Sequence, residues 1–156
     1  IEASGLDERV SYPIEIAWAL STGGRATSRL IRPEPDWTHW DPDAESVHGI
    51  SRDALFEHGL PPESVVAELR DAVGDAPLHA DHKEDGMWLA RLLRAGGTDW
   101  RPGLRFASGL IEVMAHKNRK DLSELRRQVR LKHPTTHRAG PDAEFLRDLY
   151  RAACRK

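Results

Sequence analysis

The hydrophobic pattern of this chain changes its period along the sequence, and that change most constrains the fold. Near the N-terminus, residues 13–20 form a largely apolar run and residues 25–31 alternate, on either side of a Ser-Thr-Gly-Gly turn. Such runs are typical of two strands that form a hairpin. Further along, apolar residues recur every three or four positions, as in amphipathic helices. Strands followed by helices with short strands between them predict an α/β domain.

The same periodicity gives approximate bounds for the elements. We expect helices over residues 62–73, 85–95, 108–115, 121–130 and 141–154, and short strands over residues 77–80 and 104–107. Residues 1–4 are interpreted as the end of an earlier strand that breaks at Gly5. Trp37 and Trp40 are placed in a loop that precedes a turn at His48-Gly49. Together these elements predict a mixed central sheet flanked by helices.

Length and composition narrow the class of protein. A chain of 156 residues, 39% of them hydrophobic, is long enough to bury a core as one domain over residues 1–156. Cys154 is the only cysteine, which excludes an internal disulfide and a multi-cysteine zinc site. No apolar run reaches about 18 residues, and Ile1 begins in domain-like sequence. We therefore expect no transmembrane helix, no signal peptide and a cytoplasmic location.

Three short segments carry carboxylates beside turns or helix starts. Glu2 lies at a strand end, Asp85 opens an amphipathic helix, and Asp142 follows Pro141 at the start of the last helix. Each has an ordinary explanation when taken alone. Glu2 would pass as a solvated terminal residue, and the two aspartates as helix-start residues that cap or pair with the helix dipole. Their interpretation as a site depends on their occurring together.

Four motifs occur in a fixed order over nearly the whole chain. They are Glu2-Ala3-Ser4-Gly5-Leu6, Val47-His48-Gly49-Ile50-Ser51, the segment ending in Asp85, and His137-x-Ala139-x-x-Asp142. This order resembles the DEDDh 3′–5′ exonucleases, a family that includes ribonuclease T, oligoribonuclease and the proofreading subunit of bacterial replicative polymerase. The segment Ser11-Tyr12-Pro13-Ile14-Glu15 is similar to one subgroup of that family.

The chain departs from the family pattern at two places. The family's first motif is Asp-x-Glu, so the resemblance places an aspartate directly before Ile1, and we expect the natural chain to carry it. In the middle motif, Asp81 replaces the usual asparagine and Glu84 the usual phenylalanine. Because Asp85 keeps the family spacing, it is the candidate for this motif, with Asp81 as the alternative.

The resemblance implies an RNase H-like fold with a two-metal hydrolytic site. Glu2, Asp85 and Asp142 would be the metal ligands, with His137 as the general base. Two Mg²⁺ or Mn²⁺ ions are expected, because hard cations prefer oxygen ligands and a pair can activate water and stabilise the leaving 3′ oxygen. Carboxylates clustered without cations would repel one another and raise their pKa values. An imidazole suits the general base, since it titrates near neutral pH.

The resemblance also implies a substrate and its contacts. Ala3, Ser4, Gly5 and Leu6 would cradle the 3′-terminal nucleotide, with Leu6 against its base and His48 beside the terminal sugar or base. The expected substrate is the 3′ end of a single-stranded nucleic acid, RNA in preference to DNA, and the product a nucleoside 5′-monophosphate. No membrane partner is expected. Relatives form homodimers, and a homodimer is left open for this chain.

Charge is distributed unevenly along the chain. Residues 1–75 carry 15 acidic and 6 basic side chains, whereas residues 76–156 carry 10 and 17. Residues 116–138 alone hold eight lysines or arginines. This segment either contacts substrate phosphates or forms a solvated helix face. Trp37 and Trp40 likewise either stack on bases or anchor their loop.

Two other functions stay open at this point. A catalytically impaired nucleic-acid-binding or scaffold domain is favoured by the unusual middle motif. The presence of His137 and Asp142 favours the nuclease, because a binding domain needs no general base beside a metal ligand. A phosphodiesterase acting on small dinucleotides would need the same site and less basic surface.

Overall fold

The computed structural model describes residues 1–156 and contains seven helices and five strands. The first half of the chain holds β1 (Glu2–Ala3), β2 (Pro13–Trp18), β3 (Thr27–Leu30), α1 (Pro42–His48), α2 (Arg52–His58) and α3 (Pro62–Val73). The second half holds β4 (Leu78–Ala80), α4 (Lys83–Ala95), β5 (Leu104–Phe106), α5 (Ala107–Lys117), α6 (Leu122–Arg130) and α7 (Ala139–Cys154). The predicted α/β class is confirmed, and α3 has the predicted bounds.

Hydrogen bonds link the strands into two small sheets, where the sequence predicted one mixed sheet. One sheet has the order β1-β2-β3 and is antiparallel, with Glu15 of β2 opposite Glu2 and Leu30. The other consists of β4 and β5, which are parallel. Since β1 contributes only two residues, it offers too few backbone groups to join the sheets. Apolar side chains from both sheets nevertheless meet in one cluster, where Leu78 and Leu104 pack beside Ile16.

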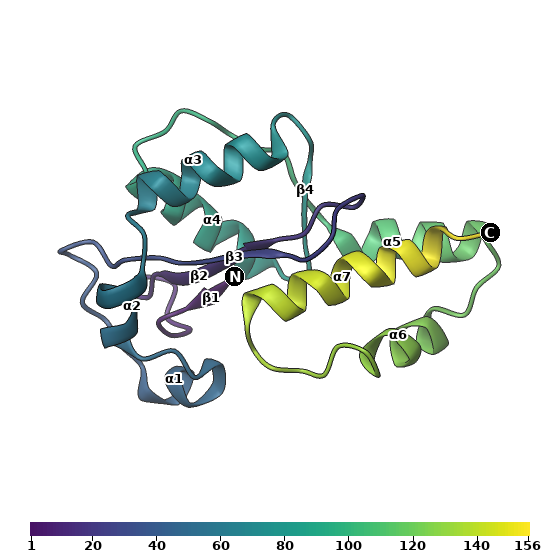
Figure 1. Cartoon of the computed structure of the whole chain (residues 1–156), viewed down its shortest axis with the longest axis horizontal. Coiled ribbons are helices and arrows are strands. Elements are labelled where there is room, and N and C mark those ends of the chain that lie inside the picture. The colour runs from purple at the N-terminus through teal and green to yellow at the C-terminus, as the bar shows by residue number, and fades with distance from the viewer.

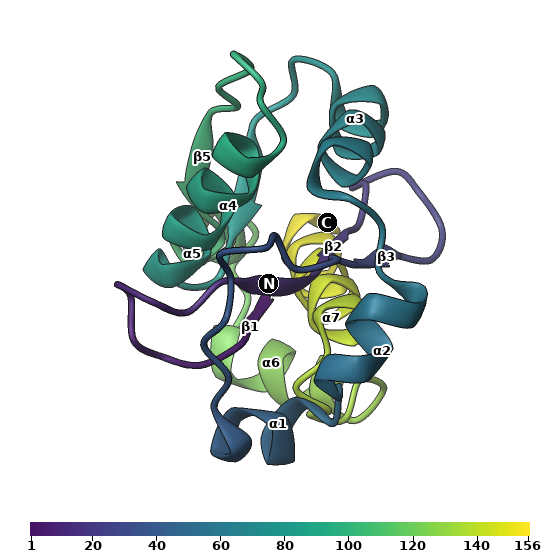
Figure 2. The same cartoon turned by 90° about the vertical axis from the view of Figure 1, so that its left-hand side faces the viewer.

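Helices cover the three-stranded sheet from two sides. In Figure 1, α3 and α4 lie above it, and α7 runs from beside β2 towards the right. Figure 2 shows the same separation from the left-hand end. The α3 and α4 side chains Val65, Leu69 and Leu92 are buried in the main apolar cluster. A second cluster lies among α5, α6 and α7. No helix combines the length and the apolar character that crossing a bilayer requires.

The segment predicted as a loop with a turn contains two short helices, α1 and α2. Asp41 caps α1 by accepting a hydrogen bond from the backbone N–H of Asp43, and Gly49 ends it with a left-handed φ of 67°. The Ser51 side chain caps α2 by accepting from the backbone N–H of Ala54. Each helix has seven residues, which is too short to show a clear helical period. Their caps define them better than their hydrophobic pattern does.

Candidate functional site

The start of β1 and the first turn of α4 lie side by side. The N-terminal ammonium of Ile1 donates a hydrogen bond to Asp85 Oδ1 at 3.0 Å, and the Asp85 side chain is 17% exposed. Asp85 Oδ2 accepts from the backbone N–H of His82 at 3.2 Å. Because His82 directly precedes α4, this bond closes a capping box. Asp85 therefore caps its helix and also lies beside the strand that carries Glu2.

Glu2 lies in the electrostatic surroundings of the α7 start. Burial raises the pKa of Glu2, and the negative charges of Asp142 and Glu15 raise it further, whereas the N-terminal ammonium and His137 lower it. The Glu2 carboxyl thus responds to the charges of Asp142 and His137, which lie more than 130 positions away in the sequence. A bound cation would relieve the repulsion between these carboxylates.

His137 is exposed and adopts an unusual backbone conformation just before α7. Its φ of 47° lies in the left-handed region, which non-glycine residues rarely occupy. Conformations of this kind persist only where neighbouring contacts enforce them, and they are frequent at functional sites. Here Arg138 and Ala139, the next two residues, are both held by the carboxylate of Glu15. The imidazole is thus presented to solvent from a fixed backbone.

Glu15 is a functional candidate that sequence reasoning did not identify. Its carboxylate, with a side chain 3% exposed, accepts from Arg138 Nε and Nη2, Ser28 Oγ and the Ala139 N–H at 2.7–3.0 Å. Burial raises the pKa of Glu15, but the bonds from Arg138, Ser28 and Ala139 outweigh it and leave the pKa below its usual value. The sequence held two signals for it: an acidic residue inside an otherwise apolar strand, and its place at the end of the Ser11–Glu15 segment that resembles one subgroup of the family.

The turn after β1 is tightly built up to Gly5 and open at Leu6. Ser4 is buried, and its Oγ accepts from the Tyr12 backbone N–H at 3.1 Å. A Cβ on Gly5 would stand 2.9 Å from His39 Nε2 and 3.0 Å from Asp41 Cβ, so a larger residue would displace the turn. Leu6, in contrast, is 87% exposed. A free apolar side chain on a rigid turn beside Glu2 suits contact with a flat apolar ligand surface.

His48 ends α1 as a buried imidazole with one unused nitrogen. Its Nδ1 accepts from the Ile50 backbone N–H at 3.0 Å, while Nε2 is buried without a partner. The Trp40 ring lies edge-on to it, with centroids 6.2 Å apart. A cavity of about 460 Å³ lies beside this turn, lined by residues of α1 and α2 together with Leu30 and Arg138. Gly49, which follows His48, and Arg138, which precedes α7, thus line the same cavity.

The two tryptophans of the preceding segment make protein contacts. Trp37 stacks on Tyr12 with centroids 5.1 Å apart, and Trp40 Nε1 donates to Glu45 Oε2 at 2.6 Å. These contacts favour the loop-anchoring interpretation over base stacking.

The donor atoms of the candidate site suit a hard divalent cation, although the side chains are not yet grouped closely enough to bind one together. Glu2, Asp85 and Asp142 offer carboxylate oxygens, the ligands that Mg²⁺ and Mn²⁺ prefer. No three histidine, cysteine or acidic side chains are grouped so that they could already hold an ion. Both oxygens of Asp85 accept from N–H groups. Asp81, the alternative, lines a different pocket among the arginines of α6.

The buried imidazole gives a pH-dependent prediction. Burial is the largest of the causes that lower the pKa of His48, so the folded state favours the neutral ring. The unfolded chain then binds more protons, and stability decreases as the pH falls below about 6.5. His48→Asn keeps an acceptor for the Ile50 N–H and should lose less stability than the parent chain between about pH 7.5 and 5.5. Thermal unfolding at both pH values checks this.

The matched control is His58→Asn, because the His58 side chain is 61% exposed. Between the two pH values, the stability of His58→Asn should change by as much as that of the parent chain. An equal loss of stability in the parent chain and in His48→Asn would contradict the prediction.

The site therefore combines Asp142 and the exposed His137 at the start of α7 with Glu2 on β1 and with Asp85, which contacts Ile1. Carboxylates can hold a cation, and an imidazole can take a proton from water. Comparison with known proteins adds no assignment, since no protein-family model matches this chain and no curated protein matches it.

Proposed function

We propose that this chain is a metal-dependent 3′–5′ exonuclease that releases nucleoside 5′-monophosphates from single-stranded nucleic acid, RNA in preference to DNA. One observation carries the proposal. Glu2 lies opposite Glu15 in the sheet, Glu15 accepts a hydrogen bond from the Ala139 N–H at the start of α7, and Ile1, next to Glu2, contacts Asp85. Glu2, Asp85, Asp142 and His137 are the four residues of this chain that match the carboxylate and histidine positions of the DEDDh motifs.

We also propose that the fold is RNase H-like. In support, β1, β2 and β3 form an antiparallel sheet, β4 and β5 are parallel, and α7 packs against β2.

In this mechanism, Glu2, Asp85 and Asp142 would hold Mg²⁺ or Mn²⁺. Such ions supply Lewis-acid stabilisation of the charge that develops on the phosphate and the leaving oxygen. His137 takes the proton from the attacking water, and Glu15 keeps the backbone next to His137 in place. Leu6 packs against the terminal base and aligns the scissile bond with the acids.

The ammonium beside Asp85 has a direct consequence for assays. A cation and this ammonium compete for the same Oδ1 atom of Asp85. An aspartate added before Ile1 converts the ammonium into an amide N–H and removes its positive charge. It also supplies the additional carboxylate that the family motif contains. We therefore expect tighter cation binding and faster cleavage from the extended chain.

The test is cleavage of 5′-labelled single-stranded RNA and DNA of one sequence by the extended chain with Mn²⁺ or Mg²⁺. We expect a ladder that shortens from the 3′ end, faster with RNA, and no cleavage in EDTA. Asp85→Asn should abolish the ladder. Asp81→Asn should not abolish it, because Asp81 lines the cavity among the arginines of α6 and does not contact Ile1 as Asp85 does. No product from either nucleic acid with either metal would rule out the exonuclease.

A second candidate is a nucleic-acid-binding domain without catalysis. The use of Asp85 Oδ2 as the helix-capping acceptor for the His82 N–H favours it. This function predicts RNA binding that divalent cations do not change, with no product in the same assay.

A further inference from the structure

A second cavity, of about 360 Å³, opens among α5, α6 and α7. The proposed chemistry at Glu2, Asp85 and Asp142 does not use it. Its apolar floor includes Ile111, Phe145 and Leu149, which belong to the second apolar cluster. Its rim carries one carboxylate, Asp81, and three guanidinium groups, those of Arg126, Arg127 and Arg130. The rim is therefore positively charged above an apolar floor.

The three arginines differ in how far the protein already engages them. Arg127 is paired with Glu124, with Nη2 to Oε1 at 2.7 Å. Arg130 lies 3.6 Å from the centroid of the Phe145 ring and also donates to the His133 carbonyl at 3.3 Å. Arg126 is exposed and makes no hydrogen bond or ion pair with the protein. The cavity thus offers the free guanidinium of Arg126 and the guanidinium of Arg130, which lies over the Phe145 ring.

The cavity lies about one helical turn along α7 from Asp142, one of the candidate metal ligands. Phe145 and Leu146 follow Asp142 by three and four positions on α7, so they lie on the same helix face, about 5.4 Å further along. On the rim of the cavity, Asp81 precedes Asp85 by four positions in the sequence. α6 packs against α7, and Figure 1 shows α6 below α7. A strand whose 3′ end lies at Asp142 would therefore have this cavity within reach of its adjoining nucleotides.

We propose that this cavity is a subsite for the substrate strand on the 5′ side of the scissile bond. Arg126 binds one phosphodiester group there, and Arg130, held on Phe145, contacts the adjoining nucleotide with its outer face. Guanidinium groups suit both contacts, because they pair with phosphate oxygens and stack on flat rings. The proposal rests on the proposed function, since it takes the strand to be the one whose 3′ end reaches the acids.

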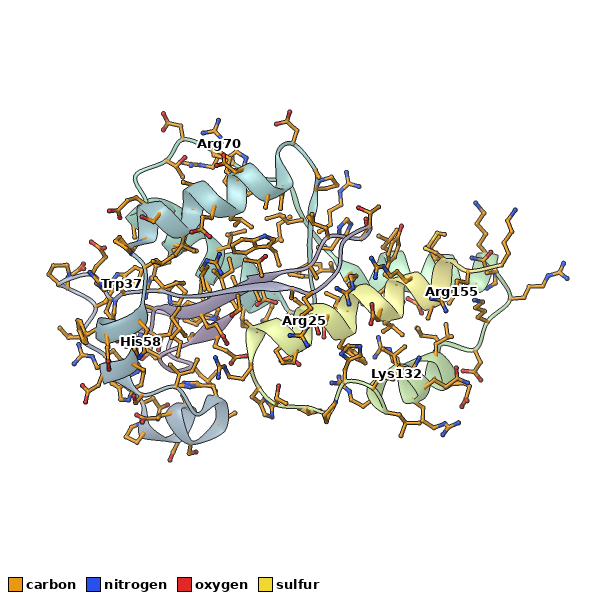
Figure 3. All side chains as sticks on the ribbon, viewed as in Figure 1. Arg25, Trp37, His58, Arg70, Lys132 and Arg155 are labelled. Carbon is orange, nitrogen blue, oxygen red and sulfur yellow. The ribbon has the colours of Figure 1, made fainter.

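The test is fluorescence anisotropy of a labelled single-stranded RNA in EDTA, where binding is read without cleavage. Arg126→Gln should weaken binding about five- to tenfold and lower the slope of log K against log salt by about 0.7. The matched control is Arg70→Gln. Arg70 is exposed on α3, and Figure 3 shows it on the upper face, away from Lys132 and α6. This control should bind like the parent chain.

A double-mutant cycle then identifies the phosphate. RNAs with one neutral methylphosphonate linkage are compared at successive positions upstream of the 3′ end. At one position the neutral linkage should weaken binding by the parent chain several-fold and binding by Arg126→Gln hardly at all.

Three results would overturn the subsite. They are equal effects of Arg126→Gln and Arg70→Gln, additive effects at every linkage, and no RNA binding by the parent chain. Failure of the exonuclease gives a different result, namely RNA binding that depends on Arg126 but no product with Mn²⁺.

Discussion

We expect His137→Ala to lower the single-turnover rate of 3′-end cleavage by about 10²–10⁴-fold. The Mn²⁺ affinity of this variant should stay within about twofold of that of the parent chain. The imidazole is exposed on a strained backbone beside Glu2 and Asp142, and it is not one of the carboxylate ligands. Its removal should therefore slow proton transfer and leave the cation site in place. Rapid-quench kinetics at saturating RNA and calorimetry with Mn²⁺ measure the two quantities separately.

Two further variants serve as comparisons for His137→Ala. Asp142→Asn should lose both cleavage and Mn²⁺ affinity, because it removes a ligand. His116→Ala changes an exposed histidine on α5 and should change neither. If His137→Ala cleaves as fast as His116→Ala, His137 is not the general base.

Glu15→Ala should lower the free energy of unfolding by about 3–4 kcal/mol. The substitution removes the acceptor for the Arg138 guanidinium, the Ser28 hydroxyl and the Ala139 backbone N–H, and it leaves the two donors at the start of α7 without this partner. Urea denaturation followed by circular dichroism measures the loss. The Glu15 contribution should also be present above about pH 4.5 and disappear as the pH falls below it, because the folded-state pKa of Glu15 is lowered.

The matched control is Glu68→Ala, which removes a partly exposed carboxylate from Arg29 at 2.7 Å. Exposed pairs of this kind contribute about 0–1 kcal/mol. Similar losses in Glu15→Ala and Glu68→Ala would show that Glu15 does not fasten α7 to the sheet.

Local signals in the sequence predicted most helices of this fold. The apolar spacing of Val65, Val66 and Leu69, followed by Gly74, gave α3 its bounds. The start of α4 at Lys83, two positions before the predicted one, follows from the cap at His82. The helices α1 and α2 were missed, because seven residues hold too little periodicity. The division into two sheets depends on pairing between distant strands, which no local pattern encodes.

The site was predictable in its residue types but not in its contacts. Motif order identified Glu2, Asp85, Asp142 and His137, whose roles stay predictions. The bonds that position the α7 start could not be read from the sequence, since Glu15 and Arg138 are 123 positions apart. The same holds for Arg126, which became distinctive only when the other arginines of the rim were found to be engaged.

Calorimetric titration of Mn²⁺ into the chain extended by an aspartate before Ile1 tests most directly whether three distant carboxylates share a cation site. We predict saturable Mn²⁺ binding by this extended chain and by its Asp81→Asn variant, and loss of binding in its Glu2→Gln, Asp85→Asn and Asp142→Asn variants. If the extended chain does not bind Mn²⁺, or if all of these variants bind it equally, the three carboxylates do not share a cation site and the proposed nuclease is contradicted.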